Sequence, residues 1–129
     1  MSVPEIIKNV GFDFSWDEEK VWKLRVPSTE IPIKDLEWHL SLPFLSEAGK
    51  YDLTPYEVID KPHYHQREYF RVQSVDLSYP IDVMENKGKL LILDGLHRLM
   101  KSYLKGLQTV KVRKIFRSQI PKIIKQTIK

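Results

Sequence analysis

Five consecutive residues, Asp94-Gly95-Leu96-His97-Arg98, combine polar groups that could bind an anion, and they stand between an apolar run and a helical pattern. The first amide groups of a helix have no intrahelical acceptor and carry the positive end of the helix dipole. Arg98 can direct two N–H donors at one phosphate or carboxylate, and His97 can donate or accept a hydrogen bond beside it. We therefore expect an anion site, most naturally a phosphate site, at this helix start.

Two residues of the stretch also have a purely structural interpretation. Asp94 stands where the helix needs an N-cap, and Gly95 permits either close approach of a ligand or an unusual φ at the turn. In the plainer alternative, Asp94 only caps the helix, Gly95 only permits the turn, and His97 and Arg98 are solvated.

The helix that presents the stretch is predicted over residues 95–105, with Gly106 at its end. Its buried face is defined by hydrophobic residues at helical spacing, and its opposite face by polar ones. The buried face holds Leu96, Leu99, Met100, Tyr103 and Leu104, and the solvent face holds His97, Arg98, Lys101, Ser102 and Lys105.

Strands are predicted on both sides of this helix. The run 90–94, "LLILD", predicts a fully buried strand, and "SYPIDVME" before it predicts another strand, joined through a turn at "NKGK". After the helix, Val110 and Val112 alternate with Lys111 and Arg113, which predicts a further strand.

The first 78 residues carry weaker patterns. Residues 1–20 predict an arm or short helix, and residues 21–36 predict an edge strand and a second short strand at 31–33, separated by prolines. "LEWHLSLPFL" is either a short helix or an irregular segment. Thr54-Pro55-Tyr56-Glu57 has the capping-box pattern of a helix start, and a further helix is expected from Pro62.

The segment "LLILDGLHRLMKSYLKGLQTVKVRKI" resembles the signature of the ParB/sulfiredoxin superfamily, in which a strand enters a D-G-x-H-R helix start and a further strand follows the helix. Residues 79–115 carry the likeness, and "IPIKDLEWHL" resembles the early strand and loop of ParB N-terminal domains more loosely. The resemblance implies a small α+β domain, a mixed sheet with packed helices, that binds nucleotide phosphates. It assigns Gly95, Leu96, His97 and Arg98 to binding ATP, ADP or CTP with Mg²⁺, and Asp94 and His97 to catalysis.

The departures from this family limit the reaction. Sulfiredoxins have a cysteine immediately before the His-Arg pair, whereas this chain has Leu96 there and no cysteine at all. The serine-kinase relatives have a glutamate base near the positions of Leu40 and Ser41, and Asp35 or Glu37 would have to substitute for it. The helix-turn-helix domain of partition proteins has no room in 129 residues. The expected function is therefore a nucleotide-dependent phosphotransferase or hydrolase.

Composition bounds the remaining alternatives. A chain of 129 residues with 42% hydrophobic content predicts one domain over residues 1–129, with an N-terminal arm at 1–20 and a basic tail at 118–129. The lack of a long apolar run predicts no membrane segment, and the lack of cysteine agrees with the cytoplasm. The net charge is +4, and residues 101–129 contain nine Lys and Arg but no Asp or Glu. A non-enzymatic DNA-binding module is thus the alternative function, with contacts from Lys111, Arg113, Lys114, Arg117 and Lys122.

Three other groups have chemical potential. His63 and His65 would share a face on a strand and could then bind a metal with Glu68 or His39, but the expected helix separates them. Asp76 and Asp82 could hold Mg²⁺ or accept a proton, although capping and solvation explain them equally. The aromatic residues are expected in the core or lining a groove, with one nucleobase contact possible; they are Trp22, Trp38, Tyr51, Tyr56, Tyr64 and Phe70.

Overall fold

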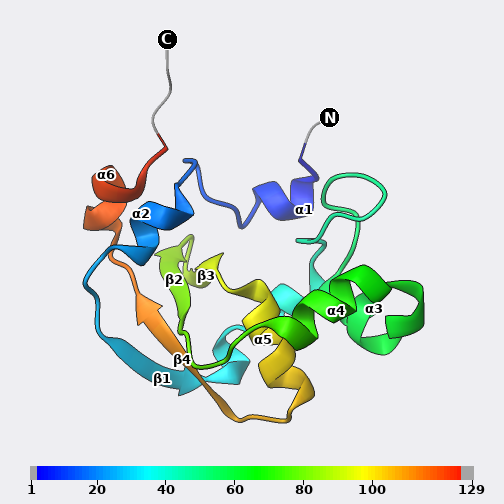
Figure 1. Ribbon diagram of the computed structural model, residues 1–129. Helices are drawn as coiled ribbons and strands as arrows, with labels where there is room; N and C mark the ends of the chain where they lie inside the picture. The colour runs from blue at the N-terminus through cyan, green and yellow to red at the C-terminus, as the bar shows by residue number, and fades with distance from the viewer. Residues whose placement is uncertain (1–2, 126–129) are drawn as a thin grey trace.

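The computed structural model describes residues 3–125, which form a four-stranded mixed sheet with helices on both sides (Figure 1). The strands are β1 (Ser28–Pro32), β2 (Ile81–Asn86), β3 (Lys89–Asp94) and β4 (Thr109–Lys114). The α-helices are α1 (Glu5–Lys8), α2 (Glu18–Trp22), α3 (Pro55–Asp60), α4 (Gln66–Ser74), α5 (Leu96–Leu104) and α6 (Ile120–Ile123). Four 3₁₀ helices connect them: η1 (Ile33–Asp35), η2 (Glu37–Ser41), η3 (Pro62–Tyr64) and η4 (Arg117–Gln119).

The strand order in the sheet is β1-β4-β2-β3. Strand β4 is antiparallel to β1 and parallel to β2, and β2 is antiparallel to β3. The predicted turn at "NKGK" joins β2 to β3, where Lys87 and Gly88 have φ values of 53° and 82°, as two-residue hairpin turns require. The expectation of a mixed α and β fold with a small mixed sheet is therefore confirmed.

The two faces of the sheet are covered by different parts of the chain (Figure 1). Helices α3, α4 and α5 lie on one side, and α1, α2 and α6 on the other. The first side contains the larger hydrophobic core, to which Ile81, Val83 and Leu99 belong, and the second contains a smaller one around Val21, Met84 and Ile123. Strand β2 serves both cores because its side chains alternate between the two faces.

The buried face of α5 is largely as predicted. Leu99 and Met100 are fully buried, and Leu96 and Tyr103 pack against the larger core. Two predictions are wrong. Leu104 is 41% exposed, since it lies in the last turn, directly before the exposed loop 105–108, and Ser102 is buried.

Strand β3 lies at the edge of the sheet, so the prediction of a fully buried strand is wrong. Leu91 and Leu93 are buried, whereas Leu90 and Ile92 are half-buried. The edge backbone is covered by two side chains from elsewhere. The Ile92 amide donates to His39 Nε2 at 3.1 Å, and Trp16 Nε1 donates to the Leu93 carbonyl at 3.0 Å. These contacts occupy groups that an edge strand otherwise leaves open to another chain.

The first 78 residues differ from prediction in detail. Residues 21–33 contain the single strand β1, because Val21 ends up within α2 and Ile33 begins η1. "LEWHLSLPFL" begins as the 3₁₀ helix η2, and the helix expected from Pro62 is the short η3 followed by α4. The capping box at α3 is confirmed, with the Glu57 amide donating to Thr54 Oγ1 at 3.1 Å.

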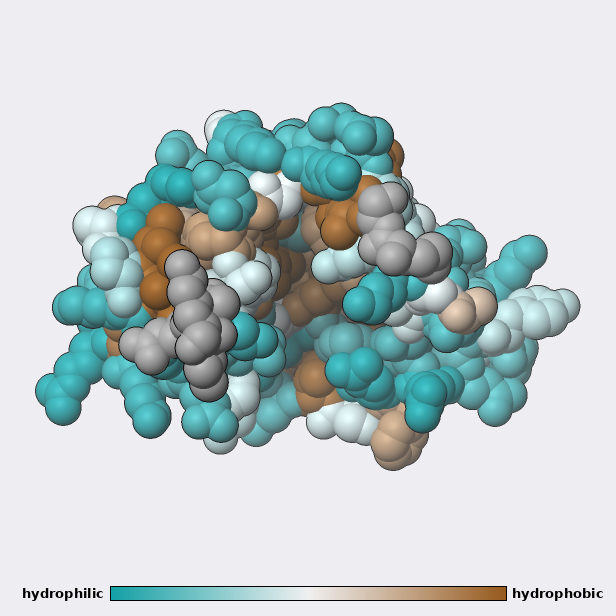
Figure 2. Space-filling view, turned by 90° about the horizontal axis from the view of Figure 1, so that it is seen from above, coloured by the Kyte–Doolittle hydropathy of each residue, from teal (hydrophilic) through white to brown (hydrophobic). Residues whose placement is uncertain are grey.

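The N-terminal segment and the end of the described chain lie on the same side of the sheet (Figure 1). Trp16 forms a bridge with Ile124, and Phe12, Phe14 and Trp16 pack against the smaller core. Seen from above, the surface between the two ends is hollowed, with hydrophobic residues at the bottom (Figure 2). The basic tail predicted at 118–129 begins with η4 and α6, and its last four residues lie outside the described range. No helix within residues 3–125 combines the length and the apolar character that a membrane crossing needs.

Candidate functional site

The predicted phosphate site is the start of α5, and Gly95 determines its backbone. Gly95 is the N-cap residue with φ 118° and ψ 21°, a conformation that side-chain-bearing residues rarely adopt. A Cβ at this position would lie 3.2 Å from the Ile81 Cα. The glycine therefore serves both the turn and the close approach of α5 to β2.

The amide groups at this helix start are free to bind an acceptor. The Leu99 amide donates to the Gly95 carbonyl at 3.1 Å, so the amides of Leu96, His97 and Arg98 precede the first helical hydrogen bond. No side chain of residues 3–125 caps them.

Asp94 does not cap the helix, so this prediction is wrong. Strand β3 has one extra residue, Leu93, because Asp82 pairs with Asp94 while Val83 pairs with Ile92. This bulge reverses the alternation of side chains and places Asp94 on the face that carries α2. There Asp94 Oδ2 accepts a hydrogen bond from Trp22 Nε1 at 2.8 Å and lies 3.6 Å from Arg98.

Arg98 reaches the same region with few strong contacts. One terminal nitrogen lies 3.4 Å from the Pro80 carbonyl and 3.6 Å from Asp94 Oδ2, both long for charge-assisted hydrogen bonds. Its Nε is buried and has no hydrogen-bond partner among residues 3–125. A buried guanidinium N–H without an acceptor is costly, so Arg98 is suited to bind an incoming anion.

His97 is held by Glu68, a residue from α4. His97 Nε2 and Glu68 Oε2 are 2.7 Å apart, and Arg71 lies 3.3 Å from the other carboxylate oxygen. The side chains of Glu68 and His97 are only 9% and 17% exposed, so the pair is shielded from water. The contact uses Nε2 and leaves Nδ1 for a proton from another group.

Sequence reasoning did not assign Glu68 to this site. The sequence holds only a weak signal: Glu68 and Val72 are four residues apart, so on a helix they share a face. The structure buries both of them. A buried carboxylate on an apolar helix face requires a partner. Which residue serves as the partner depends on how α4 packs against α5.

A cavity of about 300 Å³ opens at the start of α5. Its wall includes all five residues of the predicted stretch, and it adds residues from α2, η2 and α4. The polar lining residues contributed by these other elements are Glu18, His39 and Arg71. The structure thus brings Asp94, Gly95, Leu96, His97 and Arg98 to one cavity.

Glu18 and Asp94 form a close pair of carboxyl groups. Burial, followed by the hydrogen bond and charge of Asp94, raises the pKa of the Glu18 carboxyl. Among residues 3–125, no group of three or more acidic or histidine side chains is arranged to hold a metal. Mg²⁺ in nucleotide sites, however, needs only one or two carboxylates, since phosphate oxygens and waters complete its shell. Glu18 and Asp94 fit that donor set.

The other two candidate aspartates have structural partners. Asp82 is buried and pairs with Arg113 Nε at 2.6 Å, and burial raises the pKa of its carboxyl despite this partner. Asp76 accepts a hydrogen bond from the Ser78 amide at 2.9 Å, which lowers the pKa of the Asp76 carboxyl. Only Asp82 lies near the helix start, opposite Asp94.

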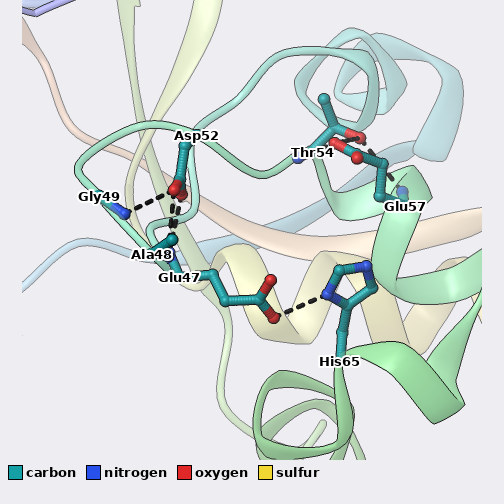
Figure 3. Close-up of polar contacts among 7 residues, drawn as sticks. All are labelled: Glu47, Ala48, Gly49, Asp52, Thr54, Glu57 and His65. Atoms are coloured by element: carbon teal, nitrogen blue, oxygen red, sulfur yellow. Dashed lines mark hydrogen bonds and ion pairs between the residues drawn. The ribbon is translucent and has the colours of Figure 1, made fainter.

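The two histidines considered for a metal site are separated. His63 lies in η3, and His65 Nδ1 is 2.7 Å from Glu47 Oε2 (Figure 3). Glu47 belongs to a loop closed by Asp52, whose carboxylate accepts backbone amides, among them that of Gly49 at 2.6 Å (Figure 3). His65 therefore has a place in the packing of this loop, while His39 lies against β3.

Several of the basic residues predicted to contact DNA donate hydrogen bonds to main-chain carbonyls of the protein. Arg113 donates to the carbonyls of Leu24 at 2.7 Å and Val21 at 2.9 Å. Lys111 reaches the Ser78 carbonyl at 3.3 Å, and Arg117 reaches the Glu85 carbonyl at 3.2 Å. Each of these residues therefore helps to hold the fold together, because it donates to a main-chain carbonyl of another segment.

The aromatic side chains divide between packing and exposure. Tyr56 packs against the larger core, whereas Tyr64 and Phe70 are 77% and 68% exposed, contrary to prediction. Trp22 is 56% exposed and lines a cavity beside Arg98.

Comparisons of the chain with protein-family models, with curated proteins and with solved structures found no match.

Proposed function

We propose that this protein binds a nucleotide through its phosphate groups at the start of α5. The observation that carries this proposal is a cavity lined by the start of α5, where no side chain caps the first amides of the helix and where Arg98 has an Nε without a partner among residues 3–125. All of these donors favour an anion with several oxygens, and the helix dipole has the same preference. A polyphosphate offers enough oxygens to accept from all of them.

The positive and negative groups around the cavity would bind different parts of the ligand. Arg98 and the amides of residues 96–98 would hold phosphate oxygens, and Arg71 lines the same cavity. Glu18 and Asp94 would hold Mg²⁺ together with the phosphates. Mg²⁺ would neutralise charge on the phosphate oxygens, and it would also offset the repulsion between the two carboxylates.

His97 is the group that we assign to proton transfer. In hydrolysis the oxygen of a water molecule, and in phosphoryl transfer that of a substrate hydroxyl, forms a bond to phosphorus while the bond from phosphorus to the leaving nucleoside phosphate breaks. The proton lost by the attacking oxygen would go to His97 Nδ1. Glu68, at 2.7 Å from Nε2, orients the ring and stabilises its charged form.

Binding is tested by calorimetric titration of ATP, ADP and CTP, each with and without Mg²⁺, into the intact protein and Arg98→Ala. Hydrogen bonds to charged groups are worth about 1.5–3 kcal/mol, so this variant should lose about 10- to 150-fold in affinity. Lys105→Ala is the matched control, because it removes one positive charge at the exposed C-terminal end of the same helix. Equal affinities of all three proteins, or no binding of any nucleotide, would refute the phosphate site.

The proton-transfer role is tested by phosphate release from the bound nucleotide. Glu68→Gln should lower the rate by about 10²-fold or more, within the range of general-base catalysis, while the nucleotide affinity changes little. If Glu68→Gln and His97→Gln both release phosphate at the rate of the intact protein, His97 has no role in proton transfer.

A further inference from the structure

A second cavity, of about 480 Å³, lies beside the start of α5 and has a mostly apolar wall. It is lined by Trp22, Tyr79 and Pro80, with Asp82, Asp94, Arg98 and Arg113 as its polar part. We infer that this cavity binds the aromatic base of the nucleotide, an inference that rests on the proposed function. The sequence motif supplies Asp94 and Arg98 to this cavity, whereas Trp22 and Tyr79 lie outside the motif and far apart in the chain.

Two exposed aromatic side chains form the wall. Trp22 is 56% exposed and Tyr79 is 61% exposed, although both are large rings that proteins usually bury in part against neighbours. The indole of Trp22 is oriented by its 2.8 Å hydrogen bond to Asp94. The ring of Tyr79 has the Arg98 guanidinium 5.8 Å from its centroid. Both rings therefore have partners that orient them while part of their surface remains free for a planar ligand.

The polar part of the cavity favours a base over a simple hydrocarbon ring. Asp82 and Asp94 are opposite each other across β2 and β3, and both line this cavity. The carboxylate of Asp82, which the Mg²⁺ site does not use, can accept a hydrogen bond from the exocyclic amino group that adenine and cytosine both carry. A site with an apolar wall and a few convergent polar groups has the composition of a small-molecule pocket, and its volume lies in the usual range of about 300–1,000 Å³.

Continuity with the phosphate site selects a nucleotide among planar ligands. Asp94 and Arg98 line both cavities, so the aromatic cavity adjoins the cavity at the start of α5. A ligand with a ring and a phosphate chain can occupy both cavities. In this arrangement Arg98 contacts the phosphates, and Trp22 and Tyr79 contact the base.

The test compares a nucleotide with the same phosphates lacking a base. Titrations of ATP, CTP and inorganic tripolyphosphate are measured with the intact protein, Tyr79→Ala and Tyr64→Ala. Base stacking on an aromatic side chain contributes about 1–3 kcal/mol, so Tyr79→Ala should weaken ATP or CTP about 5- to 150-fold. Its affinity for tripolyphosphate should stay unchanged. Tyr64→Ala, which removes another exposed ring that is not part of this cavity, should behave as the intact protein does.

Trp22 gives a second readout. Nucleotide should quench part of the tryptophan fluorescence, and Trp22→Phe should remove that part while Trp16 and Trp38 remain. Tripolyphosphate should cause less quenching than ATP or CTP at equal saturation.

The outcomes separate this inference from the proposed function. If tripolyphosphate binds and nucleotides bind no more tightly, with Tyr79→Ala unchanged, the base site is refuted and the phosphate site stands. If nucleotides bind with a dependence on Tyr79 but Arg98→Ala has no effect, the phosphate site is refuted and the base site stands. If neither nucleotide nor tripolyphosphate binds, both are refuted.

Discussion

Protonation of His39 should destabilise the fold as the pH falls, because the folded state needs the neutral ring. His39 is 1% exposed, its Nδ1 lies 2.8 Å from the Leu36 carbonyl, and its Nε2 accepts from the Ile92 amide. The proton is therefore on Nδ1, and a second proton on Nε2 would break the contact with β3. Burial lowers the pKa of His39 from 6.5 to about 4.

The sign and size of the effect follow from this pKa. Between pH 6.5 and 4, the unfolded chain binds a proton at residue 39 that the folded chain does not. The free energy of unfolding therefore decreases as the pH is lowered through this interval. The contribution is fully present above pH 6.5 and has been lost by about pH 4. A pKa lowered from 6.5 to about 4 corresponds to about 3 kcal/mol over that interval.

The assay is urea unfolding at a series of pH values from 7.5 to about 4, followed by tryptophan fluorescence. His39→Gln lacks the titrating group, so its unfolding free energy should fall by about 3 kcal/mol less than that of the intact protein. His63→Gln removes an exposed histidine and should follow the intact protein. Parallel curves for the intact protein and His39→Gln, or a pKa for His39 near 6.5 by NMR, would refute the reasoning.

Three further predictions concern packing, the buried ion pair and DNA. Leu99→Ala should cost about 2–5 kcal/mol of unfolding free energy, whereas Leu104→Ala, at an exposed position of the same helix, should cost less than about 0.5 kcal/mol in the same urea assay. Arg113→Ala should cost about 3–5 kcal/mol because it leaves Asp82 buried without its cation, while Lys114→Ala should be nearly neutral; equal losses would contradict the assigned role of Arg113. Nucleotide affinity should survive a rise from low to physiological salt, whereas duplex DNA binding should fall with a slope of about 0.9 per phosphate contacted. Tight, steeply salt-dependent DNA binding without nucleotide binding would make the DNA-binding module the better hypothesis.

Local patterns in the sequence were sufficient for the elements that carry the site. The helical spacing of Leu99 and Met100 identified the buried face of α5, and the capping box identified the start of α3. The turn between β2 and β3 was equally readable from Gly88 and its neighbours. These features depend on residues a few positions apart, whose geometry is the same in any fold.

The partners of the site residues depended on tertiary structure. A bulge at Leu93 turned Asp94 away from the helix that it was expected to cap and towards Trp22, 72 positions away in the chain. Packing of α4 on α5 brought Glu68 to His97, and the N-terminal segment brought Glu18 to Asp94. No local rule reports such contacts, because pairing register and helix packing are set by the whole core.

The sequence by itself therefore determined which backbone could bind an anion, and the tertiary structure decided which charges surround it. Gly95, followed by an amphipathic helix, is enough to predict a helix start whose first amides lack intrahelical acceptors. That Asp94 leaves these amides uncapped was decided by the bulge at Leu93. Whether Arg113 is available to a ligand is a different matter. The positive charge of Arg113 is evident from the sequence. Its hydrogen bonds to the carbonyls of Val21 and Leu24 exist only because β4 lies beside the end of α2.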